Sequence, residues 1–162
     1  MGKLFVIDGT DGSGKQTQFE KLKERLAQDG IDYQTVSFPN YESPSSALVK
    51  MYLSGEFGEH AKDISPYIAS TFYAADRYAT YITKYKTYYE NGGIILADRY
   101  TTSSMIHQAG KIENREERKK FLDWLLNFEF QLYGLPVPTE VFFLKMPTEN
   151  ALELIKNREN KF

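Results

Sequence analysis

The sequence contains no cysteine and almost no imbalance of charge, and each absence narrows the classes of protein that it can encode. Without cysteine among its 162 residues, the chain has neither a disulfide scaffold nor a thiolate metal site. Its 20 lysine and arginine residues nearly balance 22 aspartate and glutamate residues, for a net charge of −2. We therefore expect no binding to a nucleic acid polymer, although a small phosphate pocket remains compatible with this charge.

Long hydrophobic runs are also absent. The longest wholly apolar runs are about four residues, as in Ile94 to Ala97 and Val141 to Leu144, whereas a membrane-spanning helix needs ~20. The first residues, Met1 to Val6, lead directly into a strand-like run and lack the hydrophobic region of a signal peptide. We expect no association with a membrane and a cytoplasmic location. A composition of 41% hydrophobic and 26% charged residues is typical of a globular protein.

Short apolar runs alternate with longer helical patterns, and this alternation predicts an α/β fold with a doubly wound parallel sheet. Strands are expected at Lys3 to Asp8, Tyr33 to Phe38, Gly93 to Asp98 and Glu140 to Lys145. Helices are expected at Lys15 to Asp29, from Ser43-Pro44 to near Ser54-Gly55, from Ser65-Pro66 to about Asn91, from Asn114 to Tyr133 and from Thr148 to near Arg158. We predict that the first strand is central and that ligands bind at its carboxyl end.

The segment Gly9-Thr10-Asp11-Gly12-Ser13-Gly14-Lys15 follows the first strand and opens a helix. It matches Gly-x-x-x-x-Gly-Lys, the pattern of a phosphate-binding P-loop. In such a loop, backbone N–H groups surround phosphate oxygens, and Lys15 and the helix N-terminus add positive charge. A glycine-rich turn is the alternative, but it does not explain the lysine. The residues predicted to bind the phosphates of ATP are Gly9, Gly12, Ser13, Gly14, Lys15, Gln16 and Thr17.

The candidate ligands for Mg²⁺ come from two segments. A P-loop has serine or threonine at residue 16, but this chain has Gln16, and Thr17 lies about 100° further around the helix. The Gln16 amide oxygen can ligate the ion directly or through a water. Asp98 ends the apolar run that starts at Ile94, a Walker-B arrangement that brings a carboxylate near Mg²⁺ and the phosphates. Arg99 can grip a phosphate with a bidentate fork, or it forms only a surface ion pair.

Three motifs in this order resemble the thymidylate kinase family, whose members transfer the γ-phosphoryl group of ATP to dTMP. They are Asp8-Gly9-Thr10-Asp11-Gly12-Ser13-Gly14-Lys15, Phe72-Tyr73-Ala74-Ala75-Asp76-Arg77 and Asp98-Arg99-Tyr100-Thr101-Thr102-Ser103. The match extends essentially from residue 3 to residue 158, and the middle motif is the most specific because other P-loop kinases lack it. The resemblance implies ATP as co-substrate, Mg²⁺ as cofactor and dTMP as the acceptor.

The resemblance also implies roles for single residues in a dTMP site. Asp11 would accept a hydrogen bond from the sugar 3′-hydroxyl, Tyr73 would stack on thymine, and Arg77 would donate to thymine O4. Arg99 would hold the dTMP phosphate. The remaining family positions at this site are occupied by Phe38, by Ser104 near the base and by His107 beside the deoxyribose.

These residues also have plainer interpretations. Tyr73 belongs to a tyrosine-rich helix, in which most aromatic side chains pack in a core or an interface. Asp11 alone can be a turn former, and His107 alone is more often a packed histidine than a ligand.

The chain departs from the family pattern at two positions. Asn40 and Tyr41 follow Phe38-Pro39, where the family often has an arginine that reaches the acceptor phosphate, so this second clamp is missing or supplied differently. Gly12 stands where some members have an arginine, and members without it use arginines of a lid. Arg158 lies where that lid begins, and with Lys15, Asp98 and Arg99 it completes the candidate catalytic set.

The family pattern continues beyond Phe162 with the lid, another helix, a fifth strand and a loop that contacts adenine. We expect residues 1–162 to form a single P-loop kinase domain that is incomplete at the C-terminus. A homodimer packed through helices is expected from the aromatic-rich helix Pro66 to Asn91, from the Phe121, Leu125 and Phe128 stripe and from the family's usual dimer. The alternative is that both helices simply face the sheet.

Two other functions remain open at this point. One is a related kinase with another deoxynucleotide or a deoxynucleoside as acceptor, which the motif ending in Arg77 disfavours. The other is a nucleotide-binding module without turnover, which Gln16 and the missing lid favour.

Overall fold

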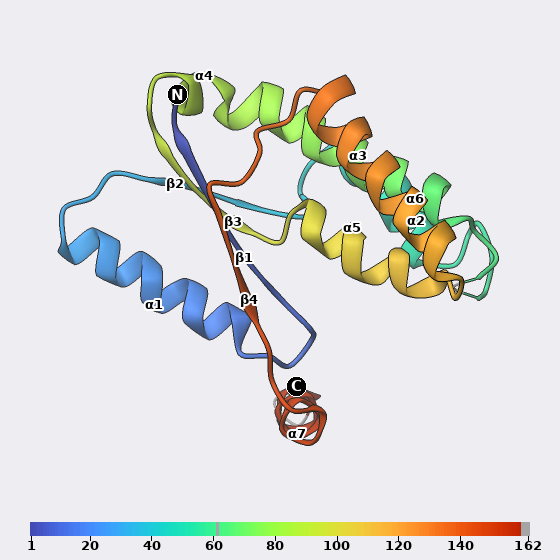
Figure 1. Cartoon of the computed structure of the whole chain (residues 1–162). Helices are drawn as coiled ribbons and strands as arrows, with labels where there is room; N and C mark the ends of the chain where they lie inside the picture. The colour runs from blue at the N-terminus through green and yellow to red at the C-terminus, as the bar shows by residue number, and fades with distance from the viewer. Residues whose placement is uncertain (61, 160–162) are drawn as a thin grey trace.

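The computed structural model describes residues 1–60 and 62–159, which form a parallel sheet with helices on both faces (Figure 1). The strands are β1 (Lys3–Gly9), β2 (Gln34–Ser37), β3 (Ile94–Asp98) and β4 (Glu140–Leu144), and their order across the sheet is β2-β3-β1-β4. β1 pairs in parallel with β3 on one side and with β4 on the other. The predicted doubly wound α/β fold with a central first strand is confirmed.

Seven α-helices lie in the described residues. They are α1 (Lys15–Gln28), α2 (Ala47–Leu53), α3 (Pro66–Thr80), α4 (Lys86–Glu90), α5 (Thr101–His107), α6 (Arg115–Leu126) and α7 (Thr148–Glu159). Short 3-10 turns lie at Pro44–Ser46 and Ala109–Lys111. The side chain of Ser65 accepts a hydrogen bond from the backbone of Tyr67 at the start of α3, and Asn114 accepts two at the start of α6. No helix in these two described ranges is long and apolar enough to cross a membrane.

The two longest helices expected from the sequence each contain a π-helical segment in the structure. The helix expected to reach Asn91 consists of α3, a π segment at Tyr81–Tyr85 and α4. The helix expected to reach Tyr133 consists of α6 and a π segment at Asn127–Leu132. Such segments often occur at functional sites.

The two faces of the sheet bury different sets of side chains. Alternate residues of the strands point to opposite faces, so Leu4 and Val6 pack on one side of β1 and Ile7 packs on the other. The first face is covered by tyrosines of the π segment and α4, and the second by α1. β4, at one edge of the sheet, is less buried than β1, and its Phe142 is 51% exposed.

α5 is a helix that the sequence does not predict. It begins with Thr101-Thr102-Ser103-Ser104, and threonine and serine are weak helix formers. Hydroxyl groups of its first turn bond to carboxylates buried elsewhere in the fold, as described below, so tertiary contacts offset the low local preference.

Candidate active site

The loop between β1 and α1 has the backbone of a phosphate-binding loop. Gly12 and Gly14 have φ angles of 75° and 77°, a left-handed conformation that favours glycine. A β-carbon on Gly12 would lie 2.5 Å from the carbonyl oxygen of Ala151, so α7 packs directly against the loop. Gly14 is the N-cap of α1, and the first N–H groups of a helix have no partner within it. These groups can therefore bind an anion.

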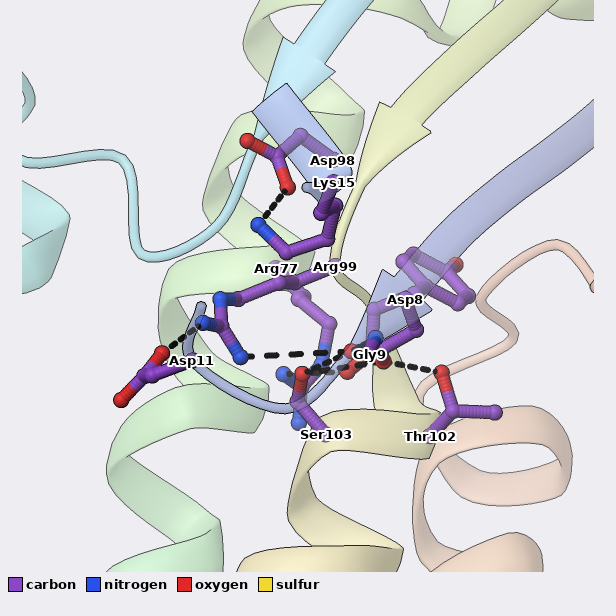
Figure 2. Close-up of polar contacts among 10 residues, drawn as sticks. Asp8, Gly9, Asp11, Lys15, Arg77, Asp98, Arg99, Thr102 and Ser103 are labelled. Carbon is purple, nitrogen blue, oxygen red and sulfur yellow. Dashed lines mark hydrogen bonds and ion pairs between the residues drawn. The ribbon is translucent and has the colours of Figure 1, made fainter. Parts of the chain in front are cut away.

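A cavity of about 560 Å³ runs along this loop. Of the residues predicted to bind ATP phosphates, those that line it are Gly12, Ser13, Gly14, Lys15 and Gln16, whereas Gly9 and Thr17 do not. The β1–β3 register pairs Ile7 with Asp98, which brings the Asp98 carboxylate to the start of the loop. There Lys15 Nζ donates to Asp98 Oδ1 at 2.8 Å (Figure 2). Lys15 and Asp98, which are distant in the sequence, thus share one cavity.

The donor atoms at this cavity fit Mg²⁺. This ion usually binds one or two carboxylates, keeps several waters and takes further ligands from phosphates. Asp98 and Gln16 supply oxygen donors on the cavity wall, and the Asp98 side chain is 24% exposed. Within residues 1–60 and 62–159, no group of three or more histidine, aspartate and glutamate side chains is arranged around a common metal position. A metal here would therefore take its other ligands from bound phosphates and water.

Arg99 occupies a strained backbone position beside Asp98. Its φ angle is 65°, a left-handed conformation that costs a non-glycine residue roughly 1–3 kcal/mol and that tends to occur at functional sites. Its Nη2 donates to Asp11 Oδ1 at 2.7 Å, and its Nη1 lies 3.9 Å from Asp8 Oδ1 (Figure 2). The Arg99 side chain is 22% exposed and that of Asp11 is 78% exposed. The pair therefore lies open to solvent and to a ligand.

Asp8 connects the P-loop to the helix that follows Arg99, a role that no motif in the sequence indicates. It is wholly buried near the end of β1, and its carboxylate accepts a hydrogen bond from the backbone of Gly9 at 2.8 Å. It also accepts from the hydroxyl of Thr102 at 2.6 Å and from that of Ser103 at 2.9 Å (Figure 2). The available signal was an acid at the carboxyl end of an apolar strand, the same pattern that identified Asp98.

A second cavity, of about 470 Å³, is lined by side chains from α2, α3 and α5. All residues predicted to contact dTMP line it, namely Asp11, Phe38, Tyr73, Arg77, Arg99, Ser104 and His107. Asp11, Pro39, Tyr41 and Arg99 line both cavities. The two cavities therefore meet at the Arg99–Asp11 ion pair.

The wall that contains Tyr73 is built from aromatic rings. Tyr73 packs edge to face on Tyr52, with ring centroids 6.2 Å apart and an interplanar angle of 84°. The Lys111 ammonium group contacts the Tyr52 hydroxyl and lies 5.1 Å from the centroid of its ring. Burial, with smaller contributions from Tyr52 and Tyr41, raises the pKa of Tyr73 to about 12. Its phenol is therefore neutral at physiological pH.

Asn40, which follows Phe38-Pro39, lines the cavity along the P-loop and has a structural role in its wall. Its backbone N–H donates to the buried Asp76 carboxylate at 2.8 Å, and its side chain donates to the Thr80 hydroxyl at 3.1 Å. Both partners lie on α3. These bonds hold the loop after β2, so that Tyr41 lines both cavities.

Arg77 reaches the second cavity from within the core and is tied to a residue that no motif indicates. It is 1% exposed, and its Nε and Nη2 donate to the two oxygens of Glu129 at 2.7 and 2.6 Å. Burial lowers the pKa of Arg77, but the charge of Glu129 and its hydrogen bonds outweigh this effect, so the pKa of Arg77 is raised. Glu129 lies in a π segment, 52 residues from its partner, and is wholly buried. The only signal in the sequence is an acidic residue between Phe128 and Phe130.

Arg158 belongs to α7, but its side chain lies outside the part of the chain that the structure describes. Its expected role beside the transferred phosphoryl group therefore stays a prediction.

Known proteins resemble this chain in sequence and in fold. A family model described as thymidylate kinase matches residues 7–162. The chain belongs to the thymidylate kinase family. Members of this family are phosphotransferases that bind nucleotides.

The relatives are similar in sequence and longer than this chain. The thymidylate kinase of Mycobacterium tuberculosis is 29% identical over 159 residues, which cover 98% of this chain and 72% of that protein. That of Bifidobacterium longum is 33% identical over 129 residues, which cover 78% of this chain and 62% of the relative. A solved structure of the Candida albicans thymidylate kinase superposes with a TM-score of 0.72 at 25% identity, covering 94% of this chain and 66% of that one. The chain thus spans about two thirds of the length of these relatives.

Proposed function

We propose that this protein transfers the γ-phosphoryl group of ATP to dTMP. The observation that supports the proposal best is the meeting of two cavities at the Arg99–Asp11 pair. One cavity follows the P-loop, and the other contains the predicted base-binding residues Tyr73 and Arg77. A donor phosphate and an acceptor phosphate bound in them would approach each other where the cavities join.

The reaction asks the protein for positioning and for stabilisation of charge. Lys15 and Arg99 each pair with a carboxylate, at 2.8 and 2.7 Å, and each can exchange that partner for a phosphate oxygen. Lys15 would then hold the donor phosphates and Arg99 the acceptor phosphate, in line with each other. The acceptor atom is already an anionic oxygen at neutral pH, so no general base is required.

Asp98 and Gln16 would hold Mg²⁺. When bound, the ion supplies positive charge to the β and γ phosphate oxygens. The salt bridge between Lys15 and Asp98 then has a second function in this proposal, since it holds both side chains on the cavity wall before the nucleotide binds.

The test is release of ADP by the 162-residue chain given ATP, Mg²⁺ and either dTMP or thymidine. We expect turnover with dTMP and none above background with thymidine. Lys15→Ala should lower the rate roughly 10²–10³-fold, in line with the loss of one positioned electrostatic donor. Lys21→Ala, an exposed lysine of the same helix, is the matched control and should leave the rate unchanged.

Two results would replace this proposal with one of the alternatives. Turnover with thymidine would identify a deoxynucleoside kinase. Binding of ATP and dTMP without release of ADP would identify a nucleotide-binding module. Other monophosphates should be included as acceptors, because the Candida albicans relative is described as having broad substrate specificity.

The proposal includes a homodimer formed through α3 and a cytoplasmic location. The exposed apolar side chains on α3 and the π segment after it are Tyr67 at 36%, Ile68 at 52%, Tyr78 at 42% and Ile82 at 42%. Phe121 and Leu125 of the other expected stripe are buried within the chain itself, so they are not available to a partner. Light scattering at micromolar concentration should give a dimer mass, and a monomer would contradict this part.

A further inference from the structure

The hydrogen-bond donors of Arg77 can be counted one by one. A guanidinium group has five N–H donors, one on Nε and two on each Nη. The Nε donor and one Nη2 donor bind Glu129, and the other Nη2 donor binds the Ser104 hydroxyl at 3.0 Å. One Nη1 donor faces the carbonyl oxygen of Tyr100 at the long distance of 3.5 Å. The last Nη1 donor has no acceptor among the described residues.

This count limits what Arg77 can do. The side chain is nearly inaccessible, yet it contributes to the wall of the second cavity. A buried donor without a partner carries a desolvation penalty, so a ligand that brings an acceptor to Nη1 gains more than one that brings a second donor. A carbonyl oxygen meets this requirement and an amino group does not.

Glu129 determines which N–H donor of Arg77 stays without an acceptor. Its bidentate contact occupies the Nε–Nη2 edge of the guanidinium and fixes the plane of the group. Glu129 is itself held by the Thr101 hydroxyl, which donates to its Oε2 at 2.7 Å. Thr101 is the first residue of α5, the helix that also carries Ser104. One buried network therefore ties α3, α5 and the second π segment together behind the cavity.

We propose that Glu129 is a positioning residue that orients Arg77 toward a base carbonyl and thereby makes the cavity prefer dTMP over dCMP. This inference rests on the proposed function, because it assumes that the second cavity takes the nucleotide base. Glu129 itself touches no ligand and acts through Arg77.

Stability alone does not account for this arrangement. A buried ion pair is commonly no more stable than well-packed apolar residues of similar size, since both charges lose their hydration. Here Glu129 fixes the orientation of an arginine that lines the second cavity. The contact with Thr101 adds a third element to the network and gives Oε2 a second hydrogen-bond donor besides Arg77 Nε.

The experiment compares the dissociation constants of dTMP and dCMP, measured by calorimetry on the 162-residue chain. Glu129→Asp keeps the negative charge but shortens the side chain by one methylene, so the bidentate contact with Arg77 is lost. The preference for dTMP over dCMP should fall roughly three- to tenfold, as expected for one misplaced hydrogen bond. Glu116→Asp, the same substitution at an exposed position of α6, should leave the preference unchanged. The ratio is insensitive to the folded fraction, because both ligands bind the same molecules.

A milder pair of variants covers the case in which Glu129→Asp does not fold. Thr101→Val removes only the hydroxyl that holds Glu129, and Thr101→Ser restores a hydroxyl. The valine variant should lower the preference about two- to threefold and the serine variant should keep it. An unchanged preference in Glu129→Asp or, where that variant is unfolded, in Thr101→Val would overturn the inference.

The outcome also separates this inference from the proposed function. Binding of dTMP without release of ADP would contradict the kinase activity, while the preference ratio would still test Glu129. Turnover with an unchanged ratio in the variants would support the activity and overturn the role of Glu129. A wild-type chain that binds dTMP and dCMP equally well would also overturn it.

Discussion

Arg77 and Arg99 line the same cavity and each pairs with a carboxylate, but the surroundings of the two pairs differ in almost every respect. Arg77 and Glu129 have side chains 2% and 0% exposed and share a bidentate contact inside the core. Arg99 and Asp11 have side chains 22% and 78% exposed and share a single contact at 2.7 Å. Arg77 lies in a regular helix, whereas Arg99 has a left-handed backbone.

The difference suits the two pairs to opposite tasks. An exposed pair contributes little to folding, so Arg99 can release Asp11 and bind a phosphate at small cost. A buried pair cannot be opened without leaving a charge unpaired in the core, so Arg77 keeps its orientation. The Arg99–Asp11 pair is thus exchangeable, and the Arg77–Glu129 pair is fixed. In the proposed function, Arg99 binds the phosphate of the acceptor nucleotide, and Arg77 forms a hydrogen bond with its base.

The largest expected effect concerns the fixed pair. Arg77→Ala leaves Glu129 buried without its partner and should lower the free energy of unfolding by about 3–5 kcal/mol, as measured by urea denaturation. Arg25→Ala, which breaks the exposed pair with Asp29, is the control and should change it by less than about 1 kcal/mol. A loss of the same small size in both variants would show that Glu129 finds another partner.

The second prediction concerns ligand binding by the exchangeable pair. Arg99→Ala removes a charge-assisted hydrogen bond to phosphate and should weaken monophosphate binding by about 1.5–3 kcal/mol. The loss should be equal for dTMP and dCMP, as measured by calorimetry. A change of base preference in this variant would mean that the nucleotide lies in the cavity in the reverse orientation.

A smaller effect is expected when the acid of the exchangeable pair is removed. Asp11→Ala should change the free energy of unfolding by about 0–1 kcal/mol, because solvent and salt screen the pair. The difference from the wild type should shrink further as the salt concentration rises. A loss as large as that of Arg77→Ala would abolish the distinction between the two pairs.

The smallest effect on stability at neutral pH is expected for Tyr73, whose phenol pKa is influenced by both Arg77 and Arg99. Arg77 and Arg99 each lower its pKa, but burial dominates and raises it to about 12 from an ordinary 10.0. The unfolded chain therefore releases this proton at lower pH than the folded chain. The contribution of Tyr73 to stability should be complete below pH 10 and lost as the pH rises toward 12.

Tyr73→Phe provides the measurement for this last prediction. Melting temperatures of the wild type and the variant should differ little in their pH dependence up to pH 10. Above pH 10, the wild type should lose stability faster than the variant. Parallel curves up to pH 12 would show that the phenol titrates normally.

The sequence predicts those parts of the site that depend on local patterns. β1, the glycines that follow it and Asp98 at the end of β3 are each identified by a short motif, and parallel strands bring these ends to one edge. Tyr73 and Arg77 come from a family motif, and both line the second cavity, while their roles in binding the base stay predictions.

The remaining parts depend on contacts between distant segments. α5 begins with poor helix formers, and its threonine hydroxyls find acceptors at Asp8 and Glu129, which lie in other elements. The π segments interrupt helices whose sequence periodicity looks continuous. The partners Arg77 and Glu129 are 52 residues apart, so no local pattern connects them.

The contact between Gly12 and Ala151 has a consequence for how this protein can change in evolution. Any side chain at residue 12 would meet the backbone of α7, which a rotamer change cannot move aside. A mutation that adds a side chain at residue 12 is therefore tolerated only together with a shift of the last helix. The P-loop and α7 lie more than a hundred residues apart, yet substitutions at residue 12 require matching changes in α7. A survey of natural variants should find replacements of Gly12 accompanied by rearranged sequence between Thr148 and Glu159.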